Sequence, residues 1–411
     1  MTSTFSTIHG NDRSTANPYR VLIAGGCYSG LAVAVNLLEK CDTIESPIPV
    51  EVTIVDERDG FYHVIGSPLA LASSSYAEKA WVEFKNIPVL QRPDVHLVHG
   101  TVSKIDPESK TAVILEQPHK IERSEPYDFF VAASGLRRVW PVVPQSVTRE
   151  NYLEETGRHI KAVINGTAPV LVVGGGAVGI EMAAELKEVQ PHVNVTLAHS
   201  RDKLLSAEPL PDNVKECALE LTQQAGVEVL LNHRLKSSTR VVKDDGTAVH
   251  EVEFENGHKM LASTVVMAIS RSTPSTDYLP AESLAGDGRV NVRPTLQLAS
   301  DKVANADAHF AVGDLINWSG IKRCGGAMHQ GHYAGLNIHQ LILQDMHGGR
   351  EPAFSTISPV PPMIGLAVGK NALSYGGEGM KHGKQVMKVF FEEDLGFRIV
   401  WDHLRLGGIN A

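Results

Sequence analysis

The sequence predicts an α/β protein in which one Rossmann-like domain is inserted into another, with a small α+β cap at the C-terminus. Three observations support this fold class. Near residue 20, a β-branched run leads into a glycine-rich turn and then a helical pattern, and the same order recurs near residue 170. Much later, a strand pattern ends in Gly313-Asp314 and precedes another helix, as expected if the first domain is completed late in the chain.

Length and charge narrow the possible classes of protein. The 411 residues are enough for two or three domains with their own apolar cores. The formal net charge of -9 provides no basic field for nucleic acid, so we expect no nucleic-acid partner. No stretch is long and apolar enough for a transmembrane segment, and residues 1–17 form a polar leader without the apolar core of a secretory signal. We expect that leader to be disordered and the protein to be cytoplasmic.

The first glycine turn follows residues 21–24 and reads Gly25-Gly26-Cys27-Tyr28-Ser29-Gly30. Such a turn directs the N-terminus of the next helix, with its unpaired N–H groups, at a pyrophosphate. A second strand, 50–55, ends at Asp56, which can accept hydrogen bonds from an adenosine ribose. Cys27 departs from the fingerprint, because a glycine usually stands there and lets the backbone approach the diphosphate. The alternative is an α/β crossover that binds no ligand.

The second glycine turn has all three glycines of the fingerprint. Residues 170–173 lead into the run from Gly174 to Gly179, and Glu181 lies in the helix that follows. The partner strand ends in His199-Ser200-Arg201 where an acid is usual. A carboxylate would repel a 2′-phosphate, whereas Arg201 can pair with it, so NADPH is favoured over NADH. The alternative is that Arg201 is a solvated arginine at the end of a strand.

Four segments, taken in order, carry a resemblance to a known family. The runs 25–30 and 174–181, Ser134-Gly135 and Gly313-Asp314 resemble the two-dinucleotide-binding-domain flavoproteins of the pyridine nucleotide-disulfide oxidoreductase superfamily. Within it, residues 195–200 and the segment after Asp314 resemble the apoptosis-inducing-factor-like group that includes ferroptosis suppressor proteins, especially the fungal type. The resemblance spans about residues 18 to 345.

The resemblance implies FAD at the first site and NAD(P)H at the second. It divides the chain into an FAD-binding domain (18–145 and 285–352), an NAD(P)H-binding domain (146–284) and a C-terminal cap or interface domain (353–411). The residues expected at FAD are Gly25, Gly26, Cys27, Ser29, Gly30, Asp56, Ser134, Gly135, Gly313 and Asp314. Those expected at NAD(P)H are Gly174, Gly176, Ala177, Val178, Gly179, Glu181, His199, Ser200, Arg201 and Ser270.

The remaining segments give two further expectations of secondary structure. Residues 242–268 are expected to contribute strands to the inserted domain, since 249–254 alternate strictly between apolar and polar side chains. In the tail, the alternating run 385–391 predicts a strand of a β-rich cap. In the wider superfamily such a cap forms a dimer interface or a lid on the quinone side, so both a monomer and a homodimer remain open.

The chemistry expected of two nested nucleotide sites needs no acid–base dyad, because hydride transfer depends chiefly on stacking two rings. Lys322 or Arg323 could replace the family lysine that contacts the flavin, and His329 is a second weak catalytic candidate. The four cysteines form no CxxC or CxxxxC pair, which excludes dithiol disulfide-reductase chemistry and leaves Cys324 as a packing residue. Histidine spacing predicts no metal site.

Three functions remain compatible with the sequence. The first is an NAD(P)H-consuming reductase of quinones or other small electron acceptors. The second is a biosynthetic flavoenzyme that oxidises a small metabolite or a sugar, as in kojic-acid-type secondary metabolism, for which Gly325-Gly326 would provide an altered pocket. The third is a redox-responsive flavin-binding protein whose dimer state follows the flavin.

Overall fold

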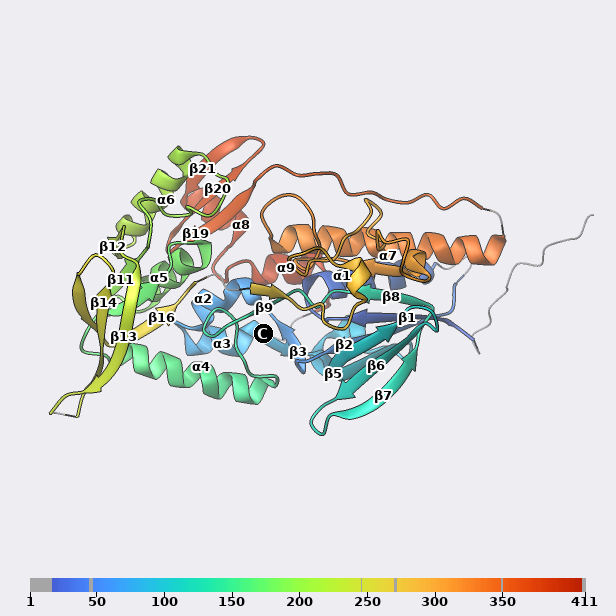
Figure 1. Ribbon diagram of the computed structural model, residues 1–411, viewed down its shortest axis with the longest axis horizontal. Coiled ribbons are helices and arrows are strands. Elements are labelled where there is room, and N and C mark those ends of the chain that lie inside the picture. Colours follow the sequence, from blue (N-terminus) through green and yellow to red (C-terminus); the bar gives the residue numbers. More distant parts are fainter. Residues whose placement is uncertain (1–16, 44–46, 245, 270–271, 349, 409–411) are drawn as a thin grey trace, which may run out of the picture.

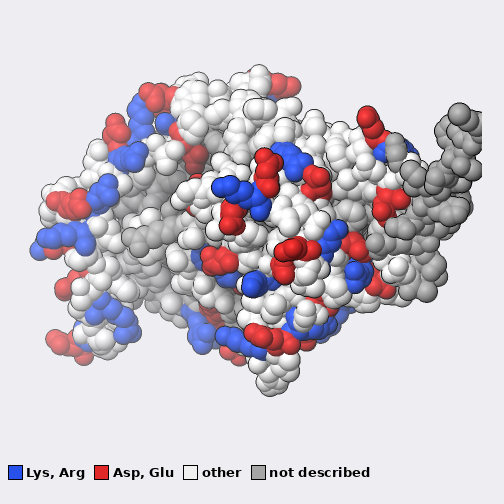
Figure 2. Space-filling model, turned by 45° about the vertical axis from the view of Figure 1, so that its right-hand side comes forward, with Lys and Arg blue, Asp and Glu red and all other residues white. Residues whose placement is uncertain are grey.

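The computed structural model describes residues 17–408 apart from 44–46, 245, 270, 271 and 349. The expected leader therefore lies almost entirely outside the described residues. Two sheets form the centres of two domains, and a C-terminal segment runs back over both of them (Figure 1). Figure 2 shows that basic and acidic side chains are interspersed over the visible face, without a continuous basic patch among the residues described there.

The first domain is built on a seven-stranded sheet in the order β18-β8-β1-β2-β5-β6-β7. Its parallel strands are β1 (Tyr19–Ala24), β2 (Val50–Asp56), β5 (Val95–Asp106), β8 (Phe129–Ala132) and β18 (His309–Ala311). The antiparallel strands β6 (Thr111–Glu116) and β7 (Ile121–Pro126) extend one edge. Because β18 pairs with β8 and residues 133–308 lie between them in sequence, the first domain encloses the second, which confirms the predicted nesting.

Two helices of the first domain pack closely on each other. The helix α1 (Tyr28–Cys41) follows the first glycine turn, and α7 (Cys324–His347) lies along it. Glycines permit the close approach, because a Cβ added to Gly331 would lie 2.3 Å from the carbonyl oxygen of Ser29. This contact fixes the start of α1 relative to the loop that carries Gly313 and Asp314.

The second domain has a four-stranded parallel sheet in the order β12-β11-β10-β16. Its strands are β10 (Val170–Val173), β11 (Val195–Ala198), β12 (Glu228–Leu230) and β16 (Thr264–Met267), and its helices are α4 (Arg149–Ile164), α5 (Ala177–Val189) and α6 (Asp212–Gln224). The predicted strands between 242 and 268 are confirmed. In this segment, β14 (Ala248–Phe254) and β15 (Lys259–Ala262) form an antiparallel sheet with the preceding strand β13 (Leu235–Val242), and this sheet lies beside β16. The chain enters through β9 (Leu136–Arg138) and leaves through β17 (Ser272–Pro274), which pair with each other.

Short elements join the two domains. The strands β3 (Gly60–Tyr62) and β4 (Trp81–Glu83) pair, and the helices α2 (Ser67–Ala70) and α3 (Ser74–Ala80) lie between them in sequence. Although α2 follows the first glycine site, it packs against α5 of the inserted domain, and Gln190 donates a hydrogen bond to the Ala72 carbonyl (3.1 Å). Single 3-10 turns occur at Val64–Gly66, Phe84–Asn86, Pro88–Leu90, Ala281–Ser283 and Ala306–Ala308.

The C-terminal segment bridges the domains. The strands β19 (Ile364–Val368), β20 (Asn371–Gly376) and β21 (Gly379–Gly383) form a sheet, and its apolar side chains share a core with α5 and α6. The helix α9 (Phe397–His403) instead packs into the core of the first domain through Phe397, Val400 and Trp401. The tail therefore fastens the inserted domain to its host.

One predicted element is wrong. The alternating run 385–391 was expected to be a strand, but residues 384–390 form the helix α8 (Lys384–Phe390). The sheet of the cap already ends at Gly383, so the run has no strand to pair with. Its Lys, Gln and Met residues favour a helix, and Val386 is buried while Val389 and Phe390 are exposed, as a single helical face requires.

We expect Trp401→Ala to lower the free energy of unfolding by about 3–5 kcal/mol, because it removes a large buried ring. Trp401 is 2% exposed and stacks on Phe397 with ring centroids 5.6 Å apart. Urea denaturation measures the change. The control Val389→Ala, at a side chain that is 57% exposed, should stay within about 0.5 kcal/mol of wild type. Equal losses in both variants would contradict the bridging role of α9.

Candidate functional site

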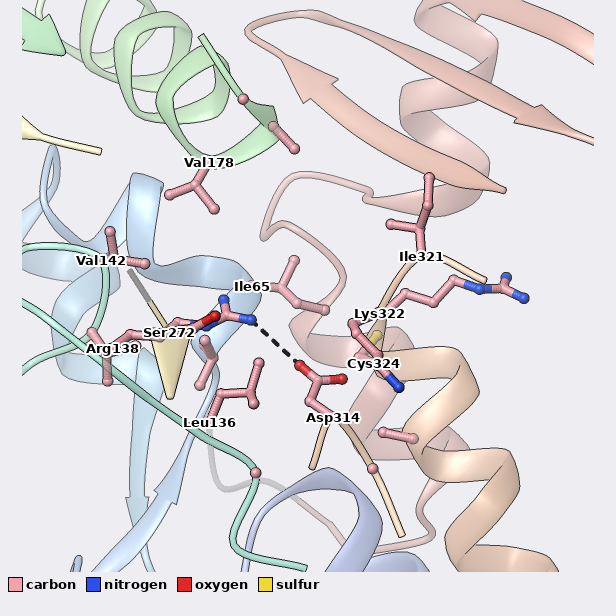
Figure 3. Close-up of a pocket in the computed structure, with 18 of the residues that line it drawn as sticks. Ile65, Leu136, Arg138, Val142, Val178, Ser272, Asp314, Ile321, Lys322 and Cys324 are labelled. Atoms are coloured by element: carbon pink, nitrogen blue, oxygen red, sulfur yellow. Dashed lines mark hydrogen bonds and ion pairs between the residues drawn. The ribbon is translucent and has the colours of Figure 1, made fainter. Parts of the chain in front are cut away.

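A cavity of about 1880 Å³ lies where the carboxyl ends of the parallel strands of both domains meet. Both glycine turns line it, as do the loop after β18, the β9–β17 ribbon and the C-terminal segment. Figure 3 shows its centre, where Val178 from the start of α5 lies on one side and Asp314, Lys322 and Cys324 lie on the other. Ligands of open α/β sheets bind in this position, outside the carboxyl ends of the strands.

The first glycine turn brings an uncapped helix to this cavity. Gly25 has φ +114°, and a Cβ added to Gly30 would lie 1.8 Å from the Gly25 carbonyl oxygen, so both positions require glycine. The helix α1 has no side-chain cap and no acidic residue in its first turn. The N–H groups at its start are therefore directed at the cavity without a competing anion.

The second glycine turn repeats this geometry. Gly174 has φ +124°, and a Cβ added to Gly179 would lie 1.8 Å from the Gly174 carbonyl oxygen. The helix α5 also lacks a side-chain cap and an acid in its first turn. A Cβ added to Gly176 would meet no atom within 4 Å, which leaves room for a diphosphate at this turn.

The structure explains why cysteine replaces glycine at position 27. Cys27 has φ -103°, a value that any residue adopts, and its thiol lies 3.4 Å from the Tyr62 carbonyl oxygen, to which it donates. The side chain is therefore held against β3. Burial raises the pKa of the Cys27 thiol to about 12, so it remains neutral. The departure from the fingerprint costs the turn no backbone strain.

Asp56 at the end of β2 and His199 directly after β11 occupy equivalent positions. The Gly26 N–H donates to Asp56 Oδ2 (2.6 Å), and the Gly175 N–H donates to His199 Nδ1 (3.0 Å). Burial raises the pKa of Asp56 above its ordinary value, and Arg58 and the N–H groups of Gly26 and Arg58 oppose that shift. His199 is therefore the counterpart of Asp56 at the second turn.

The His199 ring is neutral in this arrangement. Its Nδ1 accepts from the backbone, so its proton lies on Nε2, which is 2.8 Å from Ser206 Oγ. Burial, followed by the nearby Arg201 charge, lowers the pKa of His199. Ser200 and the exposed Arg201 also line the cavity, and no carboxylate of the described residues pairs with Arg201.

A third set of residues lines the cavity beside the first turn. Ser134 donates to the Ser275 carbonyl (2.7 Å), and Gly135 has φ +65° with open space at its Cβ position. The Gly313 N–H donates to Gln330 Oε1 (2.7 Å). The next residue, Asp314, lies at the cavity wall.

Asp314 lies between two cations. Arg138 is 3.4 Å from its carboxylate, as the dashed line in Figure 3 marks. Lys322 donates to the Ile316 carbonyl (2.7 Å), and burial lowers the pKa of Lys322 while the Asp314 charge opposes that shift. No sequence motif selects Arg138, because its place opposite Asp314 depends on the β9–β17 ribbon.

The predicted site residues fall into four groups. Most line the cavity, and Gly26, Gly30 and Gly179 lie behind it, where they allow close packing. His329 is exposed, does not line the cavity and packs its ring on Tyr333 (centroids 4.2 Å apart). Ser270 lies outside the described residues.

The structure also brings two cysteines to one cavity. Cys27 and Cys324 both line it as free thiols, although they come from opposite ends of the chain. Burial raises the pKa of Cys324 to about 11. Both groups therefore remain protonated and unreactive, as small packing residues do. No cluster of three or more potential metal ligands occurs among the described residues.

The residues present fit two dinucleotides. Each glycine turn is a cradle that a Cβ would obstruct, each is followed by an uncapped helix, and the two face one cavity. A flavin and a nicotinamide dinucleotide are the usual pair of dinucleotides in such an arrangement, and together they supply redox chemistry. The arrangement defines an FAD-dependent oxidoreductase that uses a nicotinamide cofactor.

Comparison with known proteins gives the particular family. The chain belongs to the pyridine nucleotide-disulphide oxidoreductase family, whose model matches residues 19–331. It is 47% identical to oxidoreductase OXR1 of Ajellomyces capsulatus over 96% of this chain and 89% of that protein. It is 25% identical to ferroptosis suppressor protein 1 of Taeniopygia guttata, covering 88% and 89% of the two chains.

A solved structure supports the fold. The sulfide:quinone oxidoreductase of Aquifex aeolicus superposes with a TM-score of 0.67 at 18% identity, over 95% of this chain and 92% of that one. Among the described residues, no helix combines the length and apolarity needed to span a membrane.

We expect Gly30→Ala to abolish retention of flavin, because the new Cβ would force the first turn open. The ratio of flavin absorbance to protein absorbance after purification measures this loss. Gly157→Ala is the control, since an added Cβ there meets no atom within 4 Å. A Gly30→Ala protein as yellow as wild type would contradict the assignment of this turn.

Proposed function

We propose that this protein is an NADPH-dependent flavoprotein reductase of a quinone or a similar small electron acceptor. The observation that carries the proposal is the single cavity onto which both uncapped helices open. Two dinucleotides held there would bring their redox rings to one place, which is the positioning that this chemistry requires. The relatives named oxidoreductase and ferroptosis suppressor protein support the same class.

The preference for NADPH rests on the residues after β11. A neutral imidazole at position 199 removes the carboxylate that would repel a 2′-phosphate, and Arg201 offers an unpaired guanidinium at the cavity. We propose that Gly176, Ala177 and Val178 bind the diphosphate of this nucleotide.

FAD binding is proposed for the first turn and the loop after β18. Asp56 would hold the adenosine ribose, and Asp314 would hold the ribityl chain beside Lys322 and Arg138. Lys322 is the better placed of the two catalytic candidates, because it lines the cavity and His329 does not. The cation would stabilise negative charge that develops on the reduced flavin.

Apolar side chains in the cavity wall support a flat, uncharged acceptor. They come from the loop after Asp314 and from the C-terminal segment, and four of the six are aromatic. These side chains are Trp318, Ile321, Met363, Tyr375, Phe390 and Phe391. A quinone is flat, uncharged and largely apolar, and therefore fits this lining.

The cytoplasm is the proposed location of the protein.

Anaerobic titration of the purified protein tests the proposal. We expect NADPH to bleach the flavin absorbance fully at about one equivalent and NADH to require a large excess. Admission of a soluble benzoquinone should then restore the oxidised spectrum. A protein that binds no flavin, or a flavin that neither nucleotide reduces, would refute the function. Bleaching by a sugar without nicotinamide would support the biosynthetic alternative.

Arg201→Ala should raise the KM for NADPH about 10- to 100-fold and leave the KM for NADH unchanged, because a charge-assisted hydrogen bond contributes about 1.5–3 kcal/mol. Steady-state kinetics with both nucleotides measures the change. Arg240→Ala removes an exposed arginine on β13 that does not line the cavity, and it should affect neither nucleotide. Equal effects on NADPH and NADH would assign Arg201 another role.

A further inference from the structure

A row of three glutamates crosses from the cavity to the surface along α5. Glu181 lines the cavity, Glu185 is 4% exposed, and Glu188 has a side chain that is 37% exposed and an ion pair with Lys370 (3.2 Å). Their spacings of four and three residues place them on one face of the helix, with neighbouring Cβ atoms about 5–6 Å apart. That face is covered by the cap.

Over most of this row, the cap contacts the glutamate carboxyl groups through backbone N–H groups and not through charged side chains. The Ala367 N–H donates to Glu181 Oε1 (3.2 Å), and the strand β19 contributes no ionisable side chain. The titratable groups that face Glu185 are Glu181, Glu188 and the buried Tyr76, whose hydroxyl donates to the Asp394 carbonyl (2.6 Å). Lys370 faces Glu188 at the outer end.

Glu185 has an oxygen without a partner. Its Oε1 is buried and accepts no hydrogen bond from any described residue. A permanently unsatisfied buried carboxyl oxygen costs stability, so its retention calls for a function. Burial raises the pKa of Glu181 to about 8 and that of Glu185 to about 8, so both can hold a proton near neutral pH and release it to a neighbour.

We propose that Glu188, Glu185 and Glu181 form a proton relay from solvent to the acceptor in the cavity. The proposal rests on the proposed function. Two-electron reduction of a quinone by NADPH consumes one proton: NADPH, H⁺ and quinone give NADP⁺ and hydroquinone. Glu181 gives its proton to an oxygen of the reduced acceptor, Glu185 reprotonates Glu181, and Glu185 is reprotonated from solvent past Glu188. Each step breaks one O–H bond and forms another, and the relay returns to its starting state.

The first test compares acceptors in wild type and Glu185→Gln. A soluble benzoquinone needs a proton, whereas ferricyanide takes electrons alone. We expect the ratio of the benzoquinone rate to the ferricyanide rate to fall about 10²-fold in Glu185→Gln. Formate, a small diffusible acid, should partly restore it. Glu220→Gln, at an exposed residue of α6, is the control and should leave the ratio unchanged. Equal losses with both acceptors, or no loss, would overturn the relay.

The pH dependence of the benzoquinone rate gives a second test. Because the relay acids must be protonated, the wild-type benzoquinone rate should decline as pH rises through about 8. Glu185→Gln should lack this decline, since its amide does not titrate. An unchanged profile in the variant would assign the decline to another group and contradict the proposal.

A third measurement needs no activity. A carboxyl whose pKa is raised on folding contributes stability below its ordinary pKa, and that stability is lost as pH rises through the folded value. As pH rises from about 6 to about 9, the urea concentration at the midpoint of unfolding should therefore decrease by more in wild type than in Glu185→Gln. If neither acceptor oxidises NADPH, the proposed function fails, and this comparison still decides the protonation of Glu185. Parallel midpoints in the two proteins would overturn the relay.

Discussion

Two glycine positions, where no side chain has room, set the geometry on which the rest of the molecule depends. At Gly30 and Gly179 the first turn of a helix lies so close to the carbonyl of the preceding glycine turn that a Cβ has no space. Each contact fixes the direction in which a helix begins relative to its strand. Since both helices begin uncapped at one cavity, fixed backbone dipoles would hold two anionic ligands there, with few charged side chains needed.

The parts of this arrangement that are local in sequence could be predicted. Strand, turn and helix at both sites follow from apolar runs and glycine spacing, and Asp56 and His199 were found because each stands directly after the apolar run of its strand. The geometry also accounts for Cys27, because Gly25, Gly26 and Gly30 each have a positive φ or a closed Cβ position, whereas Cys27 has an ordinary negative φ. The glycine that is usual at that position is therefore needed for the backbone to approach a ligand more than for the turn to fold.

What depends on distant parts of the chain could not be predicted. Arg138 meets Asp314, and Cys27 shares a cavity with Cys324, only because β18 returns to the first sheet. The run 385–391 has the alternation of a strand, but the edge that would pair with it is absent. Glu185 is at a helix position that usually faces solvent or another charge, and the cap that buries it comes almost 180 residues later.

The C-terminal segment also sets an order of assembly. As the chain leaves the ribosome, the inserted domain has all the strands of its parallel sheet by residue 267, while its host still lacks β18, α7 and α9. Domains generally fold as units during synthesis, so the inner domain can collapse before the outer one is complete. Until β19 arrives, the glutamate face of α5 remains hydrated and its carboxyl groups ionise freely. Synthesis of the segment from β19 to α9 therefore both fastens the two domains together and buries Glu185, while Glu188 stays partly exposed.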